Sequence, residues 1–360
     1  MKKRILSFAL ALVMALALTA CGGNGGQSGK DQTSSGGSGD SASPDASGGS
    51  DSGITETYNW TVSSGLAVGS SWDLGLLRFA ELLNERSGGK ITLTVHSGGT
   101  LGSAKETLEG VQMGSIDFIV ESSASLSNFT DAMSVFDLPY LFKNNEEARK
   151  GLGGDAARGQ LDALEANGFK GINYWENGIY AIGSVKEVHS LADLAGMRVR
   201  SIDSPLQADV YNALGAQPVV LSWGDIYTSL QQGVIEAVSS TTVPNMYTTN
   251  FYEVAPYIVL SNHGYSPAPL LCNLDMWNAL PANVQELVTA CADEAREYHY
   301  EVCDQQMSEF RANMEANGAT FIDIDTNEWS NAVQPVYDKY VGGSGIDPAL
   351  VDAIRADVAG

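Results

Sequence analysis

The chain has 360 residues, of which 44% are hydrophobic and 18% are charged. This composition is typical of a soluble globular protein and excludes a disordered chain or one with many membrane spans. Its 20 basic and 43 acidic residues give a net charge of −23, which excludes the basic footprint that nucleic-acid binding requires. The length exceeds one typical core, so we expect two lobes after the N-terminal segments.

The N-terminus has the pattern of a bacterial export signal. Residues 2–4 are basic, and residues 5–18 form an apolar run that is too short for a comfortable membrane span. Residues 18–21, Leu-Thr-Ala-Cys, resemble a lipobox. We therefore expect residues 1–20 to be a lipoprotein signal peptide and Cys21 to carry lipid such as palmitate. The alternatives are a plain secretory signal with an incidental cysteine and a short transmembrane anchor.

A low-complexity segment follows the predicted lipid site. Residues 22–53 include 11 glycines and 9 serines, a composition that cannot bury enough apolar surface to offset its ordering entropy. With Cys21 itself, residues 21–53 are predicted to be a disordered tether. Without the three basic residues of the signal peptide, 17 basic residues face 43 acidic ones, a net charge of −26. Such a charge repels anions at long range, so any anion site must be local and enclosed.

The first half of the remaining chain alternates strands and helices. Alternating apolar residues predict strands at residues 58–62 and 91–95, the apolar run at residues 116–120 is typical of a buried strand, and a further strand is expected at residues 169–174. Helices are expected at residues 71–85, from the end of the glycine-rich loop 98–102 to near Gly114, and at residues 155–167. Glu121 directly follows one of these strands. A carboxylate at this position can cap the turn or helix that comes next.

Residues 196–240 are the most informative stretch. Two strands at residues 197–201 and 217–221 flank a helix that begins near Pro205, a second helix covers residues 223–232, and a further apolar run begins at Val234. This order predicts parallel strands with crossover helices, in which ligands lie beyond the carboxyl ends of the strands. Arg200 closes the first strand, and its guanidinium matches a carboxylate with two parallel hydrogen bonds. Arg198 shares its sheet face, but Arg200 lies nearer the expected crevice.

The last third contains a long helix. Residues 254–260 are predicted to form a strand, residues 261–265 to cross back to the first lobe, and residues 281–318 to be helical over about 50 Å. Residues 321–324 and helices after Asn327 are expected to complete the second lobe.

Catalytic and metal-binding motifs are missing from the sequence. There is no G-x-S-x-G elbow, no phosphate-binding loop, no paired G-x-G-x-x-G fingerprint, no HExxH and no CxxC. We therefore predict no enzyme activity, no cofactor and no metal site. His263 could act as a ligand or base, but a hydrogen-bonded structural histidine is the preferred interpretation. Cys291 and Cys303 lie about 18 Å apart on a continuous helix and cannot pair, while a disulfide involving Cys272 stays open.

Several phrases carry a family resemblance. They are GMRVR at residues 196–200, GAQP at 215–218, DIYTSLQQG at 225–233 and VIEA at 234–237, preceded by FAELLNERSGG, GTLG and DLPYLF. The chain resembles the DctP-type solute-binding proteins of TRAP (tripartite ATP-independent periplasmic) transporters. The resemblance implies an α/β, two-lobed, type II periplasmic-binding-protein-like clamshell with mixed, mostly parallel sheets and a long bridging helix. Residues 54–177 and 266–305 would form lobe I, and residues 178–265 and 306–360 lobe II.

The same resemblance implies a function. The protein would capture an organic acid in an interlobe cleft and deliver it to membrane permease subunits. It would be a monomer outside the cytoplasm, attached by lipid to the cell membrane. Two alternatives remain open, a ligand-sensing module for a membrane receptor and a surface enzyme acting on a small acid.

The resemblance also implies a ligand site with Arg200 as the carboxylate anchor. Its other members would be Glu121, Trp223, Asn177, Trp72, Tyr180 and Ser240. Two of these have an alternative role: Glu121 could instead cap the turn or helix that follows it, and Trp223 could instead belong to the core of its lobe. Two of these positions depart from the family pattern. Tyr180 stands where many members have an arginine, and Ser240 stands where they commonly have an asparagine. With one arginine retained, a monocarboxylate fits better than a dicarboxylate.

Overall fold

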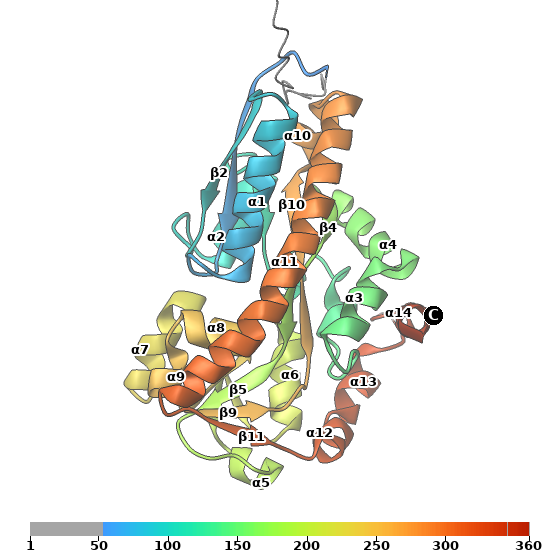
Figure 1. Ribbon diagram of the computed structural model, residues 1–360. Helices are drawn as coiled ribbons and strands as arrows, with labels where there is room; N and C mark the ends of the chain where they lie inside the picture. Colours follow the sequence, from blue (N-terminus) through green and yellow to red (C-terminus); the bar gives the residue numbers. More distant parts are fainter. Residues whose placement is uncertain (1–52, 344, 360) are drawn as a thin grey trace, which may run out of the picture. The chain divides into compact units, whose positions relative to one another are not determined.

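Two β-sheets organise the chain, which we describe from a computed structural model of residues 53–343 and 345–359 (Figure 1). All of these residues belong to one structural unit. The predicted signal peptide, Cys21 and the glycine- and serine-rich segment up to residue 52 lie outside the described residues.

The first sheet has five strands in the order β2-β1-β3-β10-β4. The strands are β1 (Tyr58–Ser64), β2 (Ile91–His96), β3 (Phe118–Val120), β4 (Phe169–Ile179) and β10 (Tyr265–Asn273). β1 is parallel to β2 and β3, whereas β10 is antiparallel to β3 and β4. Helices α1 (Ser71–Arg86), α2 (Ala104–Gln112) and α10 (Leu274–Ala279) accompany this sheet. We call the sheet and its helices lobe I.

The second sheet has six strands in the order β11-β9-β5-β8-β6-β7. The strands are β5 (Ala181–Ser184), β6 (Arg198–Ser201), β7 (Gln217–Val220), β8 (Ala237–Thr241), β9 (Tyr257–Leu260) and β11 (Thr320–Asp323). The accompanying helices are α5 (Leu191–Leu194), α6 (Pro205–Ala213), η4 (Trp223–Asp225), α7 (Ile226–Gln231), α8 (Val243–Thr248) and α9 (Phe251–Val254). β6 is parallel to β7 and β8, which confirms the predicted parallel arrangement. We call this sheet and its helices lobe II.

Local sequence explains where the helices near the sheet edges begin. Ser70 accepts a hydrogen bond from Asp73 N at the start of α1, and Ser103 forms a capping box at the start of α2. At the start of α6, Ser204 accepts from Gln207 N and Pro205 occupies the first turn. Such side chains satisfy amide groups that have no partner within the helix, which stabilises each start by about 1 kcal/mol.

Two strand connections join the sheets. β4 pairs with β10 along its whole length and leads directly into β5 through Tyr180, whose amide donates to Gly264 O. The return path runs from β9 through residues 261–264 into β10. The predicted strand at residues 254–260 begins later than expected, because Val254 closes α9 instead.

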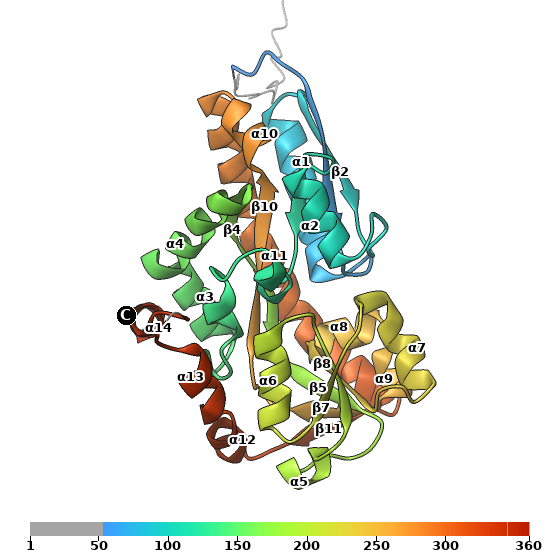
Figure 2. The same ribbon diagram turned by 180° about the vertical axis from the view of Figure 1, so that it is seen from behind.

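The helix α11 (Ala282–Ala316) passes along both lobes. Its 35 residues correspond to about 50 Å at 1.5 Å per residue. It packs against α1 and β4 of lobe I and against α8 of lobe II, as Figures 1 and 2 show from opposite sides. The bridging helix that the resemblance implied is therefore present.

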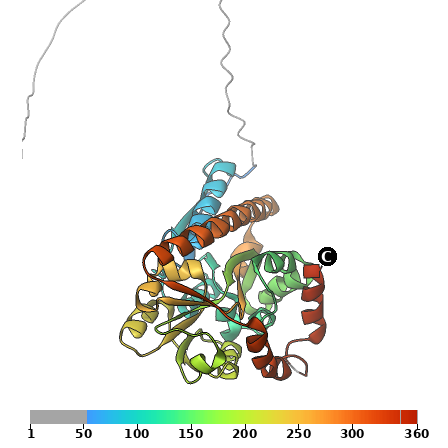
Figure 3. The same cartoon turned by 60° about the horizontal axis from the view of Figure 1, so that its bottom comes forward.

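The C-terminal helices divide between the lobes. After α12 (Thr326–Ala332), α13 (Gln334–Tyr340) packs against α6, but α14 (Pro348–Ala359) packs against α3 (Asn145–Gly153) and α4 (Asp155–Ala163) (Figure 3). The sequence assigned all of residues 306–360 to lobe II. Gly154 explains the close contact, because a Cβ there would lie 1.9 Å from Asp357 Oδ2. We therefore propose that α14 belongs with lobe I.

The DLPYLF segment also contacts the other lobe. Gln207 Nε2 of α6 donates to Asp137 O, and Tyr140 N donates to His263 O. One apolar cluster contains Phe136 and Leu138 together with side chains of α6. Although residues 137–142 lie within the predicted first lobe, they pack partly on the second. Their packing makes the hydrophobic core continuous between the lobes.

Candidate ligand-binding site

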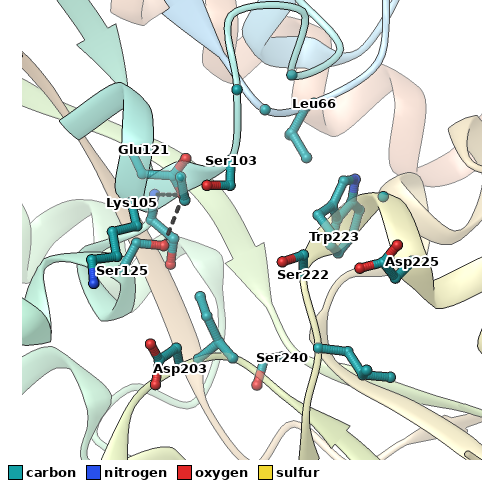
Figure 4. Close-up of a pocket in the computed structure, with 18 of the residues that line it drawn as sticks. Leu66, Ser103, Lys105, Glu121, Ser125, Asp203, Ser222, Trp223, Asp225 and Ser240 are labelled. Carbon is teal, nitrogen blue, oxygen red and sulfur yellow. Dashed lines mark hydrogen bonds between the residues drawn. The ribbon is translucent and has the colours of Figure 1, made fainter. Parts of the chain in front are cut away.

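A cavity of about 650 Å³ lies between the two sheets (Figure 4). Its walls come from the segments that follow β1, β2 and β3 in lobe I and β6 and β7 in lobe II, with one residue from the end of β8. These are the carboxyl ends of the strands, where open α/β sheets bind ligands. The volume suits a small organic molecule.

Arg200 of β6 lines this cavity and is only 4% exposed. Its Nε donates to Leu221 O over 3.2 Å, and its Nη1 donates to Ser239 O over 3.4 Å. Within the part of the chain that the structure describes, Nη2 has no hydrogen-bond partner and no carboxylate lies within 4.0 Å of the guanidinium. Burial lowers the pKa of Arg200 to about 10, so the group is a cation at neutral pH. A buried cation without a counterion is costly unless a ligand provides one.

Arg198 differs although it lies on the same strand. Its side chain is 45% exposed, its Nε lies 3.5 Å from Glu236 Oε2, and its Nη2 donates to Gly233 O. It does not line the cavity. Of the two arginines on this strand, the one nearer the strand end therefore lines the cavity, as the sequence predicted.

Trp223 and Ser240 border Arg200 in lobe II. The guanidinium carbon lies 5.6 Å from the centroid of the Trp223 ring, within the range of a cation–π contact. Ser240 lines the cavity with a φ of 52°, a left-handed conformation that is uncommon outside glycine. Its Oγ lies 2.7 Å from the buried Tyr211 hydroxyl. Both predicted residues therefore reach the same wall as Arg200.

Glu121 occupies the opposite wall, directly after β3 (Figure 4). It is 8% exposed, and its Oε1 accepts from Ser122 N and from Ser125 Oγ. The two donors come from the residue before the 3₁₀ helix η1 (Ser123–Asn128) and from a side chain within it, and η1 has no side-chain cap on its first amides. Burial raises the pKa of Glu121, and the hydrogen bonds and the charge of Arg200 oppose that shift. The Glu121 side chain therefore faces the cavity while one of its carboxylate oxygens is held by the segment that follows β3.

Trp72 and Asn177 line the cavity near the connection between the lobes. The indole Nε1 of Trp72 donates to Glu176 O over 2.9 Å, which fixes the ring. Asn177 Oδ1 accepts from Asn245 Nδ2 over 2.7 Å. Trp72 thus presents an apolar face, and the strand β4 holds the polar group of Asn177 in place.

Tyr180 does not line the cavity, contrary to its predicted role. Its side chain is 1% exposed and lies against Gly264, where a Cβ would come within 2.8 Å of the tyrosine ring. Its ring centroid lies 5.6 Å from that of His263. His263 is buried as well, with Nδ1 and Nε2 near the hydroxyls of Ser261 and Ser239. Burial lowers the pKa of His263 to about 3, which agrees with a structural histidine.

Several lining residues escaped the sequence analysis. They are mostly small or polar and lie in the loops and first helical turns that follow strands: Leu66, Ser103, Lys105, Ser125, Asp203 and Ser222. The available signal was that these segments follow strands, because the carboxyl ends of parallel strands meet at one edge. Asp203 also joins the lobes, since its carbonyl and its Oδ2 accept from Asn128 Nδ2.

The described part of the chain lacks the features of a metal site or a membrane span. No cluster of three or more His, Cys, Asp or Glu side chains suited to a metal occurs among those residues. None of the helices described is long and apolar enough to cross a membrane. Cys272, Cys291 and Cys303 are all buried and free, so the structure shows no disulfide at Cys272.

Two α/β sheets with a cavity between them, two strand connections and a bridging helix define a two-lobed, clamshell-type binding protein. Residues 62–342 match the family model described as bacterial extracellular solute-binding protein, family 7 (DctP). The C4-dicarboxylate-binding protein DctB of Bacillus subtilis is 30% identical over 293 residues, which are 80% of this chain and 83% of the relative. The C4-dicarboxylate-binding periplasmic protein DctP of Rhodobacter capsulatus is 29% identical, over 79% of this chain and 86% of the relative.

A solved structure gives the same result. A TRAP periplasmic solute-binding protein from Xanthobacter autotrophicus, with bound β-D-galacturonate, superposes with a TM-score of 0.79 and 27% identity, covering 83% of this chain and 99% of that one. The chain therefore belongs to the DctP-type solute-binding proteins of TRAP transporters, extracellular solute-binding family 7.

Proposed function

We propose that this protein captures an organic acid outside the cytoplasm and delivers it to the membrane permease of a TRAP transporter. The observation that carries the proposal is the buried guanidinium of Arg200, which has no carboxylate partner among the residues described and faces the cavity. A ligand carboxylate would supply the missing counterion and accept the hydrogen bonds that Nη2 leaves unused. Trp223 would shield this ion pair from water, which strengthens it.

Relatives support the same class of ligand. The two curated relatives are named for C4-dicarboxylates, and the structural relative holds a sugar acid. All of these ligands carry a carboxylate, although they differ elsewhere. The family consists of solute-binding transport proteins, and we propose that this chain acts by binding and not by catalysis.

A thermal-shift screen of organic acids tests the proposed function. A ligand at 100 times its Kd should stabilise the protein by about 2.7 kcal/mol, and Arg200→Ala should abolish the shift. The function would be contradicted if no organic acid in a broad panel raised the unfolding temperature, or if the variant responded as strongly as the wild type.

We further propose that Cys21 carries a lipid that attaches the protein to the membrane. Residues 18–21 resemble a lipobox, and a glycine- and serine-rich segment follows. Cys21→Ser should move the protein from the membrane fraction to the soluble fraction, as immunoblotting of the two fractions would show. A variant that stays in the membrane fraction after a high-salt wash would contradict lipid attachment.

A further inference from the structure

Glu121 carries an acceptor that the protein itself leaves unused. Its Oε1 receives both hydrogen bonds, from Ser122 N and Ser125 Oγ. Its Oε2 has no hydrogen-bond partner among the residues that the structure describes, and the side chain lines the cavity. Gly65 leaves room beside this atom, because even a Cβ at that position would stay 3.6 Å away. This oxygen is therefore reached from the cavity and is free to accept a hydrogen bond from a ligand.

Arg200 does not provide that donor. The two side chains lie on different walls of the cavity and are more than 4.0 Å apart, although each affects the charge of the other. The cavity therefore presents a cation at one wall and a hydrogen-bond acceptor at the other. A complementary molecule has a carboxylate at one end and a hydroxyl at the other.

The second carboxylate of a dicarboxylate ligand would be repelled by the negative charges that line the cavity. Besides Glu121, the cavity is lined by the acids Asp203 and Asp225, whereas its cations are Arg200 and Lys105. Lys105 is exposed on the first turn of α2, where water screens its charge. A dicarboxylate would bring its second charge towards the buried Glu121 and leave Oε2 without a donor. Such like-charge contacts cost several kcal/mol.

The rest of the lining suits a molecule with several hydroxyl groups. Ser122, Ser125, Ser222 and Ser240 are among the lining residues. The Ser125 hydroxyl donates to Glu121 and those of Ser122 and Ser240 each have one protein partner, so all three keep acceptor capacity for a ligand hydroxyl. Trp72, Trp223 and Leu66 supply apolar surface between them. Alternating hydroxyl groups and C–H faces are the chemical character of a sugar acid.

We infer that the ligand is a hydroxylated monocarboxylate of the sugar-acid class, with its carboxylate on Arg200 and a hydroxyl group donating to Glu121 Oε2. This inference rests on the proposed function and sharpens it. Glu121 is then the residue that determines specificity against dicarboxylates. It does so in two ways, by accepting from a hydroxyl and by repelling a second carboxylate.

Two matched pairs of acids test the inference with the purified full chain. Galactonate and galactarate differ only at one end, where the first has CH₂OH and the second a carboxylate, and gluconate and glucarate differ in the same way. Calorimetry at neutral pH should show that the monocarboxylate of at least one pair binds, and that it binds more tightly than its partner by about tenfold or more. This comparison needs no variant.

The variant Glu121→Gln tests whether Glu121 causes the preference for the monocarboxylate over the dicarboxylate. The amide oxygen can still accept from Ser122 N and Ser125 Oγ, so the fold should be kept, and thermal unfolding checks this. Without the negative charge, the ratio of the two affinities should shrink to about threefold or less, with the dicarboxylate gaining and the monocarboxylate losing affinity. The matched control is Asp131→Asn, which removes the same charge from an exposed loop residue outside the cavity lining and should keep the wild-type ratio.

Three results would overturn the inference. They are a dicarboxylate that binds as tightly as its partner, a ratio that Glu121→Gln leaves unchanged, and the failure of both monocarboxylates to bind. Dicarboxylate binding that is lost selectively in Lys105→Ala would place the second carboxylate on Lys105. If other acids still bound through Arg200 in these cases, the proposed function would stand and only the ligand class would be wrong.

Discussion

Arg200 in the cavity and Glu176 in β4 are both buried charges, but their surroundings differ. The Glu176 side chain is 2% exposed, its Oε2 accepts from Arg149 Nε over 2.8 Å, and its Oε1 accepts from Asn145 Nδ2 over 2.9 Å. Arg149 continues to Asp304 of α11 with two further hydrogen bonds. Among the residues that the structure describes, Arg200 forms hydrogen bonds with two carbonyl oxygens and has no carboxylate within 4.0 Å.

This difference indicates that Glu176 stabilises the fold, whereas Arg200 serves ligand binding. The protein satisfies the charge of Glu176 internally, and the partners come from α3 and α11, so this network holds the strand connection between the lobes. The protein does not give Arg200 a counterion. The free-energy cost of burying this guanidinium is therefore offset only when a ligand carboxylate binds. We therefore expect changes at Glu176 and its partners to affect stability, and changes at Arg200 to affect affinity.

The largest expected effect is at Arg200. Removing one partner of an enclosed ion pair costs about 2–5 kcal/mol, so Arg200→Ala should weaken acid binding by roughly 30-fold to several thousand-fold. Arg200→Lys keeps the charge but loses the planar fork, and should recover only part of the affinity. Calorimetry measures both variants, with Arg198→Ala as the control on the same strand. Unchanged affinity in a folded Arg200→Ala protein would place the site elsewhere.

Arg149→Ala should show the opposite pattern. It leaves the buried carboxylate of Glu176 with Asn145 alone, so the free energy of unfolding should fall by about 2–4 kcal/mol. Because Arg149 does not line the cavity, acid affinity should change little. Chemical denaturation and calorimetry measure the two quantities.

A double variant serves as the matched control for this loss. Arg149→Ala combined with Glu176→Gln removes the stranded charge and should regain most of the stability. The comparison fails if Arg149→Ala is as stable as the wild type, or if it weakens binding as much as Arg200→Ala.

Asp137 is a third buried ionisable group and can be compared with Glu176 and Arg200. It is 4% exposed, Ser204 Oγ donates to its Oδ2, and no cation lies within 4.0 Å among the residues described. Burial raises the pKa of Asp137 to about 7. Unlike Arg200, this group lies outside the cavity lining, so it is expected to become neutral rather than to bind a ligand.

A pKa that is higher in the folded than in the unfolded protein makes stability fall as pH rises. The unfolded chain loses this proton near pH 4, whereas the folded protein keeps it until about pH 7. Relative to Asp137→Asn, the wild type should therefore lose about 2–3 kcal/mol of stability between about pH 5 and pH 8. Denaturant titrations at several pH values measure the difference. A difference that does not vary with pH would show that Asp137 is ionised throughout.

The sequence predicted the second sheet well because its signals are local. The alternation of strands and helices from residue 196 to residue 240 fixes parallel strands, and the position of Arg200 at a strand end places it at the ligand edge. The same reasoning separated Arg200 from Arg198. Glu121 lines the cavity as well, but its ligand role came from the family resemblance.

Other features depend on contacts that sequence spacing does not encode. Tyr180 follows β4 as expected, but its side chain turns under Gly264 because that glycine leaves space for the ring. Ser240 has a left-handed backbone, a conformation that is uncommon for serine and that its sequence neighbours do not predict. The contacts of residues 137–142 with α6 and of α14 with α3 join distant segments, so no local pattern reveals them.

A crystal structure of the protein with the tightest-binding acid from the screen tests the central claim most directly. We predict that two carboxylate oxygens lie at hydrogen-bond distance, about 2.7–2.9 Å, from the guanidinium nitrogens of Arg200, with the Trp223 ring beside them. A complex in which the carboxylate binds elsewhere in the cavity, for example at Lys105, while Arg200 stays unpaired, would contradict the account.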